Sequence, residues 1–236
     1  MADVTKLRVL CLHGYRQDAA AFKSKLGGFR KATKSLLDLV FIDAPHVIEN
    51  GVYGEADTEG GRAWWFSSEK TFSSKEYTDT CRGFEESVKA IEQACKEQGP
   101  FDGILGFSQG AAMTAMILVL QSLKRIECSF KFGVLVAGFR SRSSAHDYLF
   151  AQEGVIDLPT LHVVGETDNI IPKAQATEIL PFFVSPSVLY HPGGHFLPTG
   201  LVLNQNPLVL TKNARLSGKS DGTVNKHFSE KKKHAS

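Results

Sequence analysis

Three residues that could share one nucleophilic reaction occur in the order Ser108, Asp168 and His195. Ser108 is the centre of the pentapeptide Gly106–Gly110, a G-x-S-x-G pattern that follows an apolar run. In this pattern a serine stands on a tight turn between a strand and a helix, with its hydroxyl exposed to a substrate. A histidine can remove the hydroxyl proton during attack, and an aspartate can fix the tautomer of that histidine. The order predicts acyl transfer through an acyl-enzyme, with no metal and no cofactor.

The glycines on either side of the serine have a steric explanation. A serine on such a turn adopts a rare backbone geometry and is crowded from both sides, so Gly106 and Gly110 must be nearly bare. Two other interpretations exist: a helix-capping serine in a glycine-rich turn, and a transmembrane helix, since Gly103 to Leu123 contains no charged residue. The turn is favoured because it explains why polar Ser108 and the two glycines interrupt that apolar run.

Acyl transfer also requires backbone N–H groups that stabilise the oxyanion. Gln109, directly after the nucleophile, supplies one candidate, and a loop at the end of an earlier strand supplies the other. Residues 7–12 form an apolar run that predicts a strand, and His13, Gly14 and Tyr15 follow it. We therefore predict the N–H groups of Tyr15 and Gln109 as the oxyanion hole. His13 is interpreted as a residue that orients the loop.

The acid and the base are predicted from residues that follow late strands. Asp168 lies three residues after the glycine that ends the predicted strand 160–165, and His195 follows a Gly-Gly pair after the predicted strand 187–190. His191 is a competing candidate for the base. His195 is favoured because the two glycines allow its ring to reach over the strand ends, whereas His191 precedes a proline.

Apolar runs and helical periodicity alternate along the rest of the chain. Strands are also expected at 38–42, around 104–107 and at 130–137, and helices at 18–37 with a possible break at its glycine pair, 78–98, 111–123 and 172–180. This alternation predicts an α/β fold with a mostly parallel central sheet and helices on both faces.

Two segments have no clear periodicity. Residues 47–75 contain Trp64, Trp65 and Phe66, an aromatic triplet in an otherwise polar loop. The triplet could anchor the loop in the core or form a wall of the substrate pocket, and we predict the second role while leaving the first open. Residues 138–157 are irregular and could form part of a lid.

Composition excludes several classes of function. The 236 residues carry a formal net charge of +2, but residues 201–236 hold seven Lys or Arg against two Asp or Glu, which leaves 20 basic and 23 acidic residues in the remainder. The folded body is therefore not expected to bind nucleic acid. The four cysteines have no metal-ligand spacing and are expected to be reduced thiols. No signal peptide begins the chain, so a cytoplasmic location, with possible access to the nucleus, is expected.

The chain also resembles the eukaryotic family of serine hydrolases (FSH). The resemblance rests on the motifs at residues 10–17, 64–66, 99–110, 165–168 and 193–196, and it extends over about residues 7–198. It implies an α/β-hydrolase domain over 1–200 whose triad positions match Ser108, Asp168 and His195. It further implies hydrolysis of carboxylic esters, with a preference for longer alkyl or acyl chains, and a small-molecule ester as the partner.

The sequence departs from the family after the catalytic histidine. Residues 201–236 are polar and basic without a clear helical pattern, and we expect an atypical, disordered tail. A basic localisation or nucleic-acid patch is the weaker interpretation of Lys231 to Lys233. Two alternatives to a carboxylesterase stay open: a thioesterase, and a hydrolase-fold binding protein with weak catalysis. No residue favours a peptidase.

Overall fold

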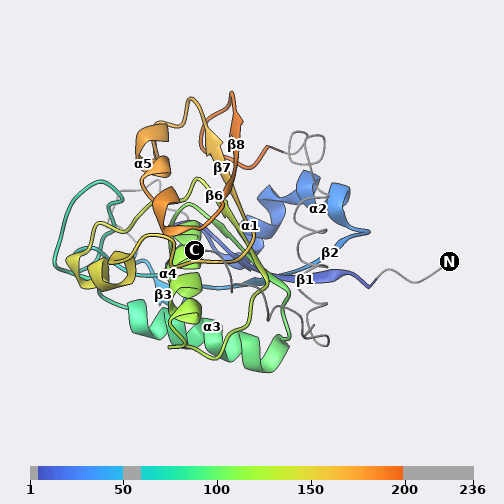
Figure 1. Cartoon of the computed structure of the whole chain (residues 1–236), viewed down its shortest axis with the longest axis horizontal. Coiled ribbons are helices and arrows are strands. Elements are labelled where there is room, and N and C mark those ends of the chain that lie inside the picture. Colours follow the sequence, from blue (N-terminus) through green and yellow to red (C-terminus); the bar gives the residue numbers. More distant parts are fainter. Residues whose placement is uncertain (1–4, 50–59, 199–236) are drawn as a thin grey trace, which may run out of the picture.

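A computed structural model of the chain describes residues 5–49 and 60–198. Six strands form one sheet in the order β2-β1-β5-β6-β7-β8, and every neighbouring pair is parallel (Figure 1). The strands are β1 (Leu7–Leu12), β2 (Leu37–Ile42), β5 (Gly103–Phe107), β6 (Phe132–Val136), β7 (Thr160–Gly165) and β8 (Ser187–His191). The sheet confirms the predicted α/β class and each predicted strand.

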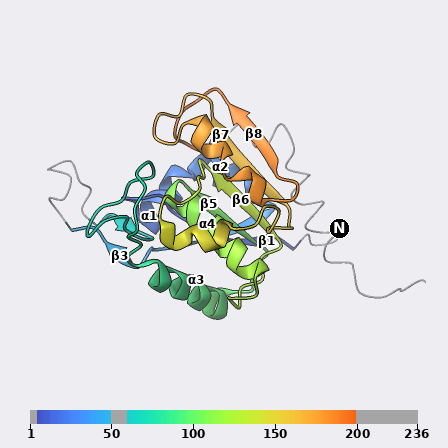
Figure 2. The same cartoon turned by 60° about the vertical axis from the view of Figure 1, so that its left-hand side comes forward.

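Helices cover both faces of this sheet, as Figures 1 and 2 show from two sides. Because side chains alternate along a strand, Leu10 and Leu12 of β1 face one core while Val9 and Cys11 face the other. The first core receives α3 (Phe84–Gln98) and α4 (Gln109–Ser122), and the second receives α1 (Ala19–Lys25) and α2 (Gly27–Thr33). Each fully buried aliphatic or aromatic side chain contributes about 1.5–3 kcal/mol to the hydrophobic term.

The uncharged run from Gly103 to Leu123 divides at Ser108 into the buried strand β5 and the almost fully buried helix α4. Its apolar character is explained by burial on both sides within the protein. Within residues 5–49 and 60–198, no helix has the length and apolarity that crossing a bilayer requires. The turn interpretation of this segment therefore agrees with the fold.

The predicted helix boundaries need correction at two places. The helix expected at 78–98 begins at Phe84, after Gly83 with a φ of 89°, because the residues before it pair with distant segments through bridges from Thr78 to Ser143 and from Arg82 to Phe66. The helix expected at 172–180 is shorter: α5 (Lys173–Thr177) is followed by the 3-10 turn η2 (Leu180–Phe182). The break in the first predicted helix is present between α1 and α2.

The two irregular segments contain short elements. The antiparallel pair β3 (His46–Val47) and β4 (Arg62–Ala63) lies in and beside the long loop, and η1 (Ser144–Phe150) is a 3-10 helix in the segment expected to be a lid. All four cysteines are free thiols, and the sulfur atoms of Cys95 and Cys128 lie 2.9 Å apart. The tail predicted at 201–236 lies outside the described residues.

Candidate active site

Ser108 lies on the turn that joins β5 to α4. Its backbone has φ 53° and ψ −116°, a combination that costs about 1–3 kcal/mol for a residue with a side chain. Its N–H donates to the carbonyl of Val136 on β6 at 2.9 Å, and its carbonyl accepts from the N–H groups of Ala111 and Ala112 at 2.9 and 3.0 Å. The strained turn is therefore held by the neighbouring strand and by the first turn of α4.

The glycines around Ser108 are required by contact with backbone. A Cβ at Gly106 would lie 2.2 Å from the carbonyl oxygen of Gly110, and a Cβ at Gly110 would lie 2.3 Å from that of Leu12. Both distances are far below any normal contact. The end of β1, the end of β5 and the start of α4 thus meet at close range, and this packing presents the serine at the carboxyl edge of the sheet.

His195 is fixed by Asp168. The His195 Nδ1 and the Asp168 Oδ2 lie 2.7 Å apart, and the other carboxylate oxygen accepts from the N–H groups of Ile170 and Ile171 at 2.9 and 2.8 Å. The carboxylate side chain is only 1% exposed and that of His195 is 20% exposed. Because an ionised carboxylate can only accept, Nδ1 carries the proton and Nε2 is left as an acceptor.

His191 has a different environment. It is buried, and its Nδ1 accepts from the N–H of Gly193 at 3.2 Å. Burial lowers its pKa. The carboxylate of Asp168 is thus hydrogen-bonded to His195 and not to the competing histidine.

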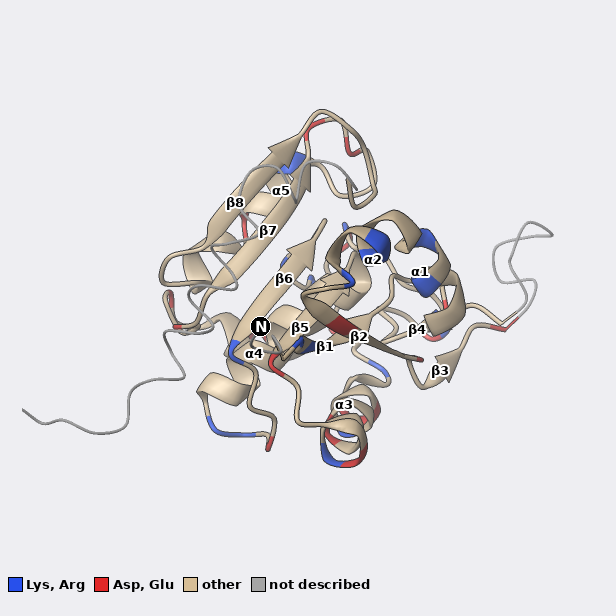
Figure 3. Ribbon diagram, turned by 90° about the vertical axis from the view of Figure 1, so that its right-hand side faces the viewer, with Lys and Arg blue, Asp and Glu red and all other residues tan. Residues whose placement is uncertain are grey.

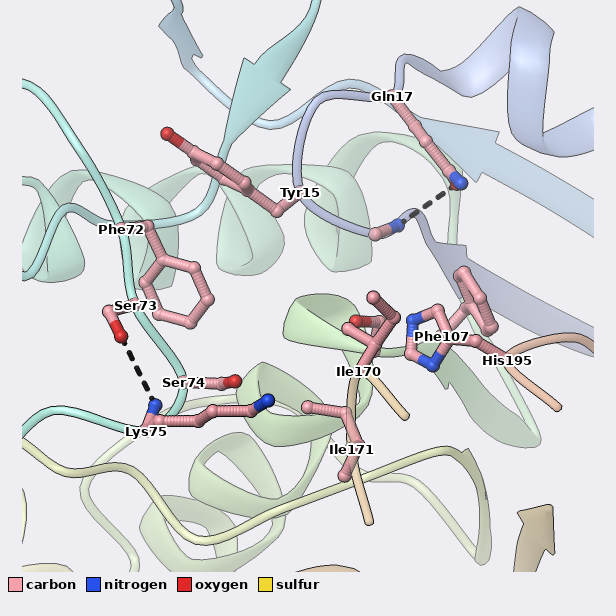
Figure 4. A pocket seen from close by; sticks show the side chains of 12 residues that line it. Tyr15, Gln17, Phe72, Ser73, Ser74, Lys75, Phe107, Ile170, Ile171 and His195 are labelled. Carbon is pink, nitrogen blue, oxygen red and sulfur yellow. Dashed lines mark hydrogen bonds between the residues drawn. The ribbon is translucent and has the colours of Figure 1, made fainter. Parts of the chain in front are cut away.

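Ser108 and His195 both line one pocket of about 390 Å³, shown in Figure 4. His195 also contacts Phe107, with ring centroids 4.8 Å apart. The rest of the lining comes from three loops that are distant in sequence, and it consists of Gly14, Tyr15, Gln17, Phe72, Ser73, Ser74, Lys75, Ile170 and Ile171. Phe107 and Ile170 give the lining an apolar surface next to His195 (Figure 4).

The two predicted oxyanion residues lie in segments that adjoin Ser108, and Tyr15 lines the same pocket as the serine. Gln109 follows it directly, and a Cβ at Gly14 would lie 3.4 Å from the Ser108 Cβ, so the turn that carries Tyr15 passes next to the serine. The buried side-chain amide of Gln109 accepts from the N–H of Trp64 at 2.9 Å and donates to the carbonyl of Trp65 at 2.8 Å. The start of α4 is therefore tied to the aromatic segment.

His13 has the structural surroundings that the sequence suggested. It is fully buried, its Nε2 accepts from the N–H of Ala44 at 3.0 Å, and its Nδ1 donates to the carbonyl of Gly14 at 2.8 Å. Burial lowers the pKa of this imidazole, which keeps it neutral. The ring orients the loop that reaches Ser108.

The aromatic triplet does not form the pocket wall, and this prediction is corrected. Trp64, Trp65 and Phe66 are buried, and none of them lines the pocket. The indole N–H of Trp64 donates to the carbonyl of His13 at 2.8 Å, and Trp65 packs behind Phe72 with ring centroids 5.2 Å apart. The triplet is a core anchor because its polar groups find partners inside the protein.

The pocket wall that was predicted for the triplet is formed instead by Phe72, Lys75, Ile170 and Ile171. None of these pocket residues was singled out from the sequence. The isoleucines had one available signal, since they lie two and three residues after Asp168, where their N–H groups bind its carboxylate. Phe72 had none, because its position depends on how a long loop crosses the sheet edge.

The sequence profile of the serine hydrolase (FSH1) family matches residues 1–206. The chain belongs to the FSH1 family. Members of this family are serine hydrolases, and the resemblance noted at the sequence level is confirmed. The α/β-hydrolase assignment and the esterase class follow from the same match together with the relatives below.

Proteins similar to this member of the FSH1 family are named esterases. Esterase OVCA2 of Danio rerio is 45% identical over 206 residues, which cover 81% of this chain and 90% of the relative. Esterase CG5412 of Drosophila melanogaster is 42% identical over 194 residues, covering 82% and 69%. Esterase OVCA2 of Homo sapiens is 38% identical over 210 residues, covering 84% and 92%.

Solved structures agree at the level of the fold. SOBER1 of Arabidopsis thaliana superposes with a TM-score of 0.59 at 20% identity, covering 83% of this chain and 93% of that one. Acyl-protein thioesterase 2 of Zea mays gives a TM-score of 0.57 at 15% identity, covering 92% and 94%. At such identities the likeness shows the shared α/β-hydrolase architecture alone.

Proposed function

We propose that this serine hydrolase is a carboxylesterase that uses Ser108 as nucleophile, His195 as general base and acid, and Asp168 as the carboxylate that orients the histidine. The observation that carries the proposal is the hydrogen bond between His195 and Asp168 at 2.7 Å, on a histidine that shares its pocket with Ser108. Ser108 stands there on a strained turn that faces the same space.

The chemistry would proceed in two halves. Nε2 of His195 removes the proton of the Ser108 hydroxyl as the oxygen attacks the ester carbonyl, and the resulting imidazolium gives that proton to the leaving alcohol. Water then attacks the acyl-enzyme by the same route and releases the carboxylic acid. Asp168 is held in place by three hydrogen bonds, so it keeps the imidazole oriented through both halves.

The oxyanion would be held by the backbone N–H groups of Tyr15, which follows the Gly14 that adjoins Ser108, and of Gln109, which follows Ser108 directly. Removing one such donor costs about 3 kcal/mol of transition-state stabilisation in comparable sites. The side-chain amide of Gln109 is fixed by two hydrogen bonds to the Trp64–Trp65 segment. The donor on the same residue is thus oriented before the charge develops.

The substrate we propose is an ester with an aliphatic acyl chain of more than a few carbons. A volume of about 390 Å³ lies in the range of small-molecule sites. Phe72, Phe107, Ile170 and Ile171 present apolar surface next to the serine and histidine. Each buried methylene would add up to about 0.8 kcal/mol of binding, so activity should increase with chain length until the pocket is filled.

The test is hydrolysis of p-nitrophenyl esters of increasing chain length by the full chain, Ser108→Ala and Cys81→Ala. We expect Ser108→Ala to lose about a millionfold in kcat, as nucleophile removal does elsewhere, while Cys81→Ala keeps wild-type activity. The matching thioester series, run in parallel, measures the preference for an oxygen or a sulfur leaving group.

A fluorophosphonate probe separates a catalyst from a binding protein. Covalent labelling of Ser108 requires an activated hydroxyl, and Ser108→Ala provides the control. A folded wild type that neither labels nor hydrolyses any ester would overturn the proposal in favour of a ligand-binding role. A series in which the shortest ester is hydrolysed best would overturn only the chain-length assignment.

A further inference from the structure

The surface of α1 and α2 carries charge of one sign. Residues 19–36 contain five basic side chains and no acidic one, although residues 1–200 as a whole contain more acidic than basic residues. The basic residues are Lys23, Lys25, Arg30, Lys31 and Lys34. Figure 3 shows blue segments on both helices. We call the surface that these five residues form the basic face.

These cations are available to an external partner. The four lysines are exposed and Arg30 is half-buried. The guanidinium of Arg30 on α2 donates to the backbone carbonyl of Lys23 on α1 at 3.5 Å, so this cation lies against the neighbouring helix. Within residues 5–49 and 60–198, none of the five is paired with a carboxylate, whereas Arg8, Arg62 and Lys131 are.

An apolar groove of about 370 Å³ adjoins the basic face. Phe22, Leu26, Phe196 and Leu197 line it, and Lys25 lies at its margin. Phe196 is 51% exposed, which is unusual for a phenylalanine. Cations beside an exposed aromatic ring and an apolar groove are the pattern of proteins that lie on a lipid surface.

The groove adjoins the active-site pocket. The two share Gln17, Phe107 and His195 in their linings. An aliphatic chain in the groove would therefore lie against His195. Nucleic acid would satisfy the cations but would leave the apolar groove and Phe196 without a partner, so the two features together favour a membrane.

We propose that α1, α2 and Phe196 form a docking surface for membranes that contain anionic phospholipid, with the groove as the route by which lipid-like esters reach the site. Binding to the surface does not depend on catalysis, while its use in substrate delivery rests on the proposed function. The attraction should be screened by salt, because exposed charges interact over about 8–10 Å at physiological ionic strength.

The test is co-sedimentation of the full chain with vesicles of phosphatidylcholine alone, and of roughly three parts phosphatidylcholine to one part phosphatidylserine. Binding is expected to the mixed vesicles only and to weaken in high salt. Lys23→Gln/Lys31→Gln should reduce affinity about 25-fold, because each lysine near an anionic surface contributes about a fivefold factor. The matched control is Lys89→Gln/Lys96→Gln, which removes the same charge from α3 and should bind like wild type.

Two further measurements keep the inference falsifiable. Ser108→Ala should bind vesicles like wild type, so loss of hydrolysis cannot be mistaken for loss of docking. Lys23→Gln/Lys31→Gln should hydrolyse a soluble short ester normally and be slower on an ester embedded in mixed vesicles. Equal affinity of both double variants, equal binding to neutral vesicles, or no binding at all would overturn the proposal.

Discussion

Two clusters in this molecule place an imidazole beside a possible nucleophile, and they differ in their third member. At the carboxyl edge of the sheet, His195 shares a pocket with Ser108 and is bonded to Asp168 at 2.7 Å. Behind the pocket, His146 lies 2.7 Å from the sulfur of Cys81, but its other nitrogen contacts the hydroxyl of Ser141 at 2.7 Å. Among the residues that the structure describes, no carboxylate is bonded to the histidine of the second cluster.

Burial increases the difference in acid–base behaviour between the two clusters. It lowers the pKa of His146 to about 4 and raises the pKa of the Cys81 thiol to about 12, so both groups stay neutral near pH 7. A neutral pair forms a stable hydrogen bond and fills the core beside Trp65 and Phe84. A catalytic imidazole needs a group that orients it and an opening to substrate, and the comparison predicts which substitutions affect turnover.

Apart from removal of Ser108 itself, the largest effect is expected from making the proposed catalytic cluster resemble the buried one. Asp168→Asn removes the charge that stabilises the imidazolium and no longer fixes the tautomer, so kcat should fall by about 10⁴. The measurement is steady-state hydrolysis of p-nitrophenyl butyrate, with circular dichroism as a check on folding. Activity within tenfold of wild type would show that His195 works without its carboxylate.

The backbone around Ser108, the proposed nucleophile, is the next point of contrast. Gly106→Ala introduces a Cβ 2.2 Å from a backbone oxygen, so the turn must shift. We expect a loss of about 1–3 kcal/mol in the free energy of unfolding, together with a large loss of kcat. Gly27→Ala is the matched control, because a Cβ there meets nothing within 4 Å. Normal turnover of Gly106→Ala would contradict the role assigned to the turn.

The buried His146 should affect the stability of the protein in acid rather than its catalytic rate. The folded pKa of His146 is about 4, below its usual 6.5, so between these values the unfolded chain binds more protons and stability falls as the pH decreases. From pH 7 to pH 5 this group alone should cost about 2 kcal/mol of unfolding free energy. His146→Asn should remove that part of the pH dependence in denaturant titrations, and an unchanged dependence would count against the lowered pKa.

The smallest effect on catalysis belongs to Cys81. Its raised pKa leaves little thiolate at neutral pH, so alkylation by iodoacetamide in the native protein should be at least about tenfold slower than for an ordinary exposed thiol. Mass spectrometry of the modified peptide measures the rate, and the unfolded chain is the control. Fast labelling accompanied by loss of esterase activity would reverse the interpretation of the two clusters.

The sequence was sufficient for those parts of the site that follow local rules. Strands β1, β5, β7 and β8 are short apolar runs, and Ser108, Asp168 and His195 follow strand ends that meet at the same edge of a parallel sheet. Small residues around the turn have a single steric explanation. The catalytic order could therefore be predicted before the structure was known, although the roles of its members stay predictions until tested.

The pocket wall could not be predicted in this way because it depends on long-range contacts. Trp64 is buried since Gln109 and His13 satisfy its backbone and indole N–H groups, and these partners lie 45 and 51 residues away. Phe72 belongs to a loop whose neighbour Lys75 donates to the carbonyl of Asn169 at 3.2 Å, 94 residues further along. Local composition contains no information about such pairings.

That loop also separates the shape of the pocket from the placement of the proposed triad. Ser108, Asp168 and His195 follow the ends of sheet strands, whereas Phe72 and Lys75 come from a segment that is bonded to the residues after β7. Lys75 donates to the carbonyl of Asn169, and Gln175 donates to the carbonyl of Ser74. Because loops tolerate sequence change better than the strands they connect, a substitution at Phe72 can alter which substrates fit while the strand ends keep their places.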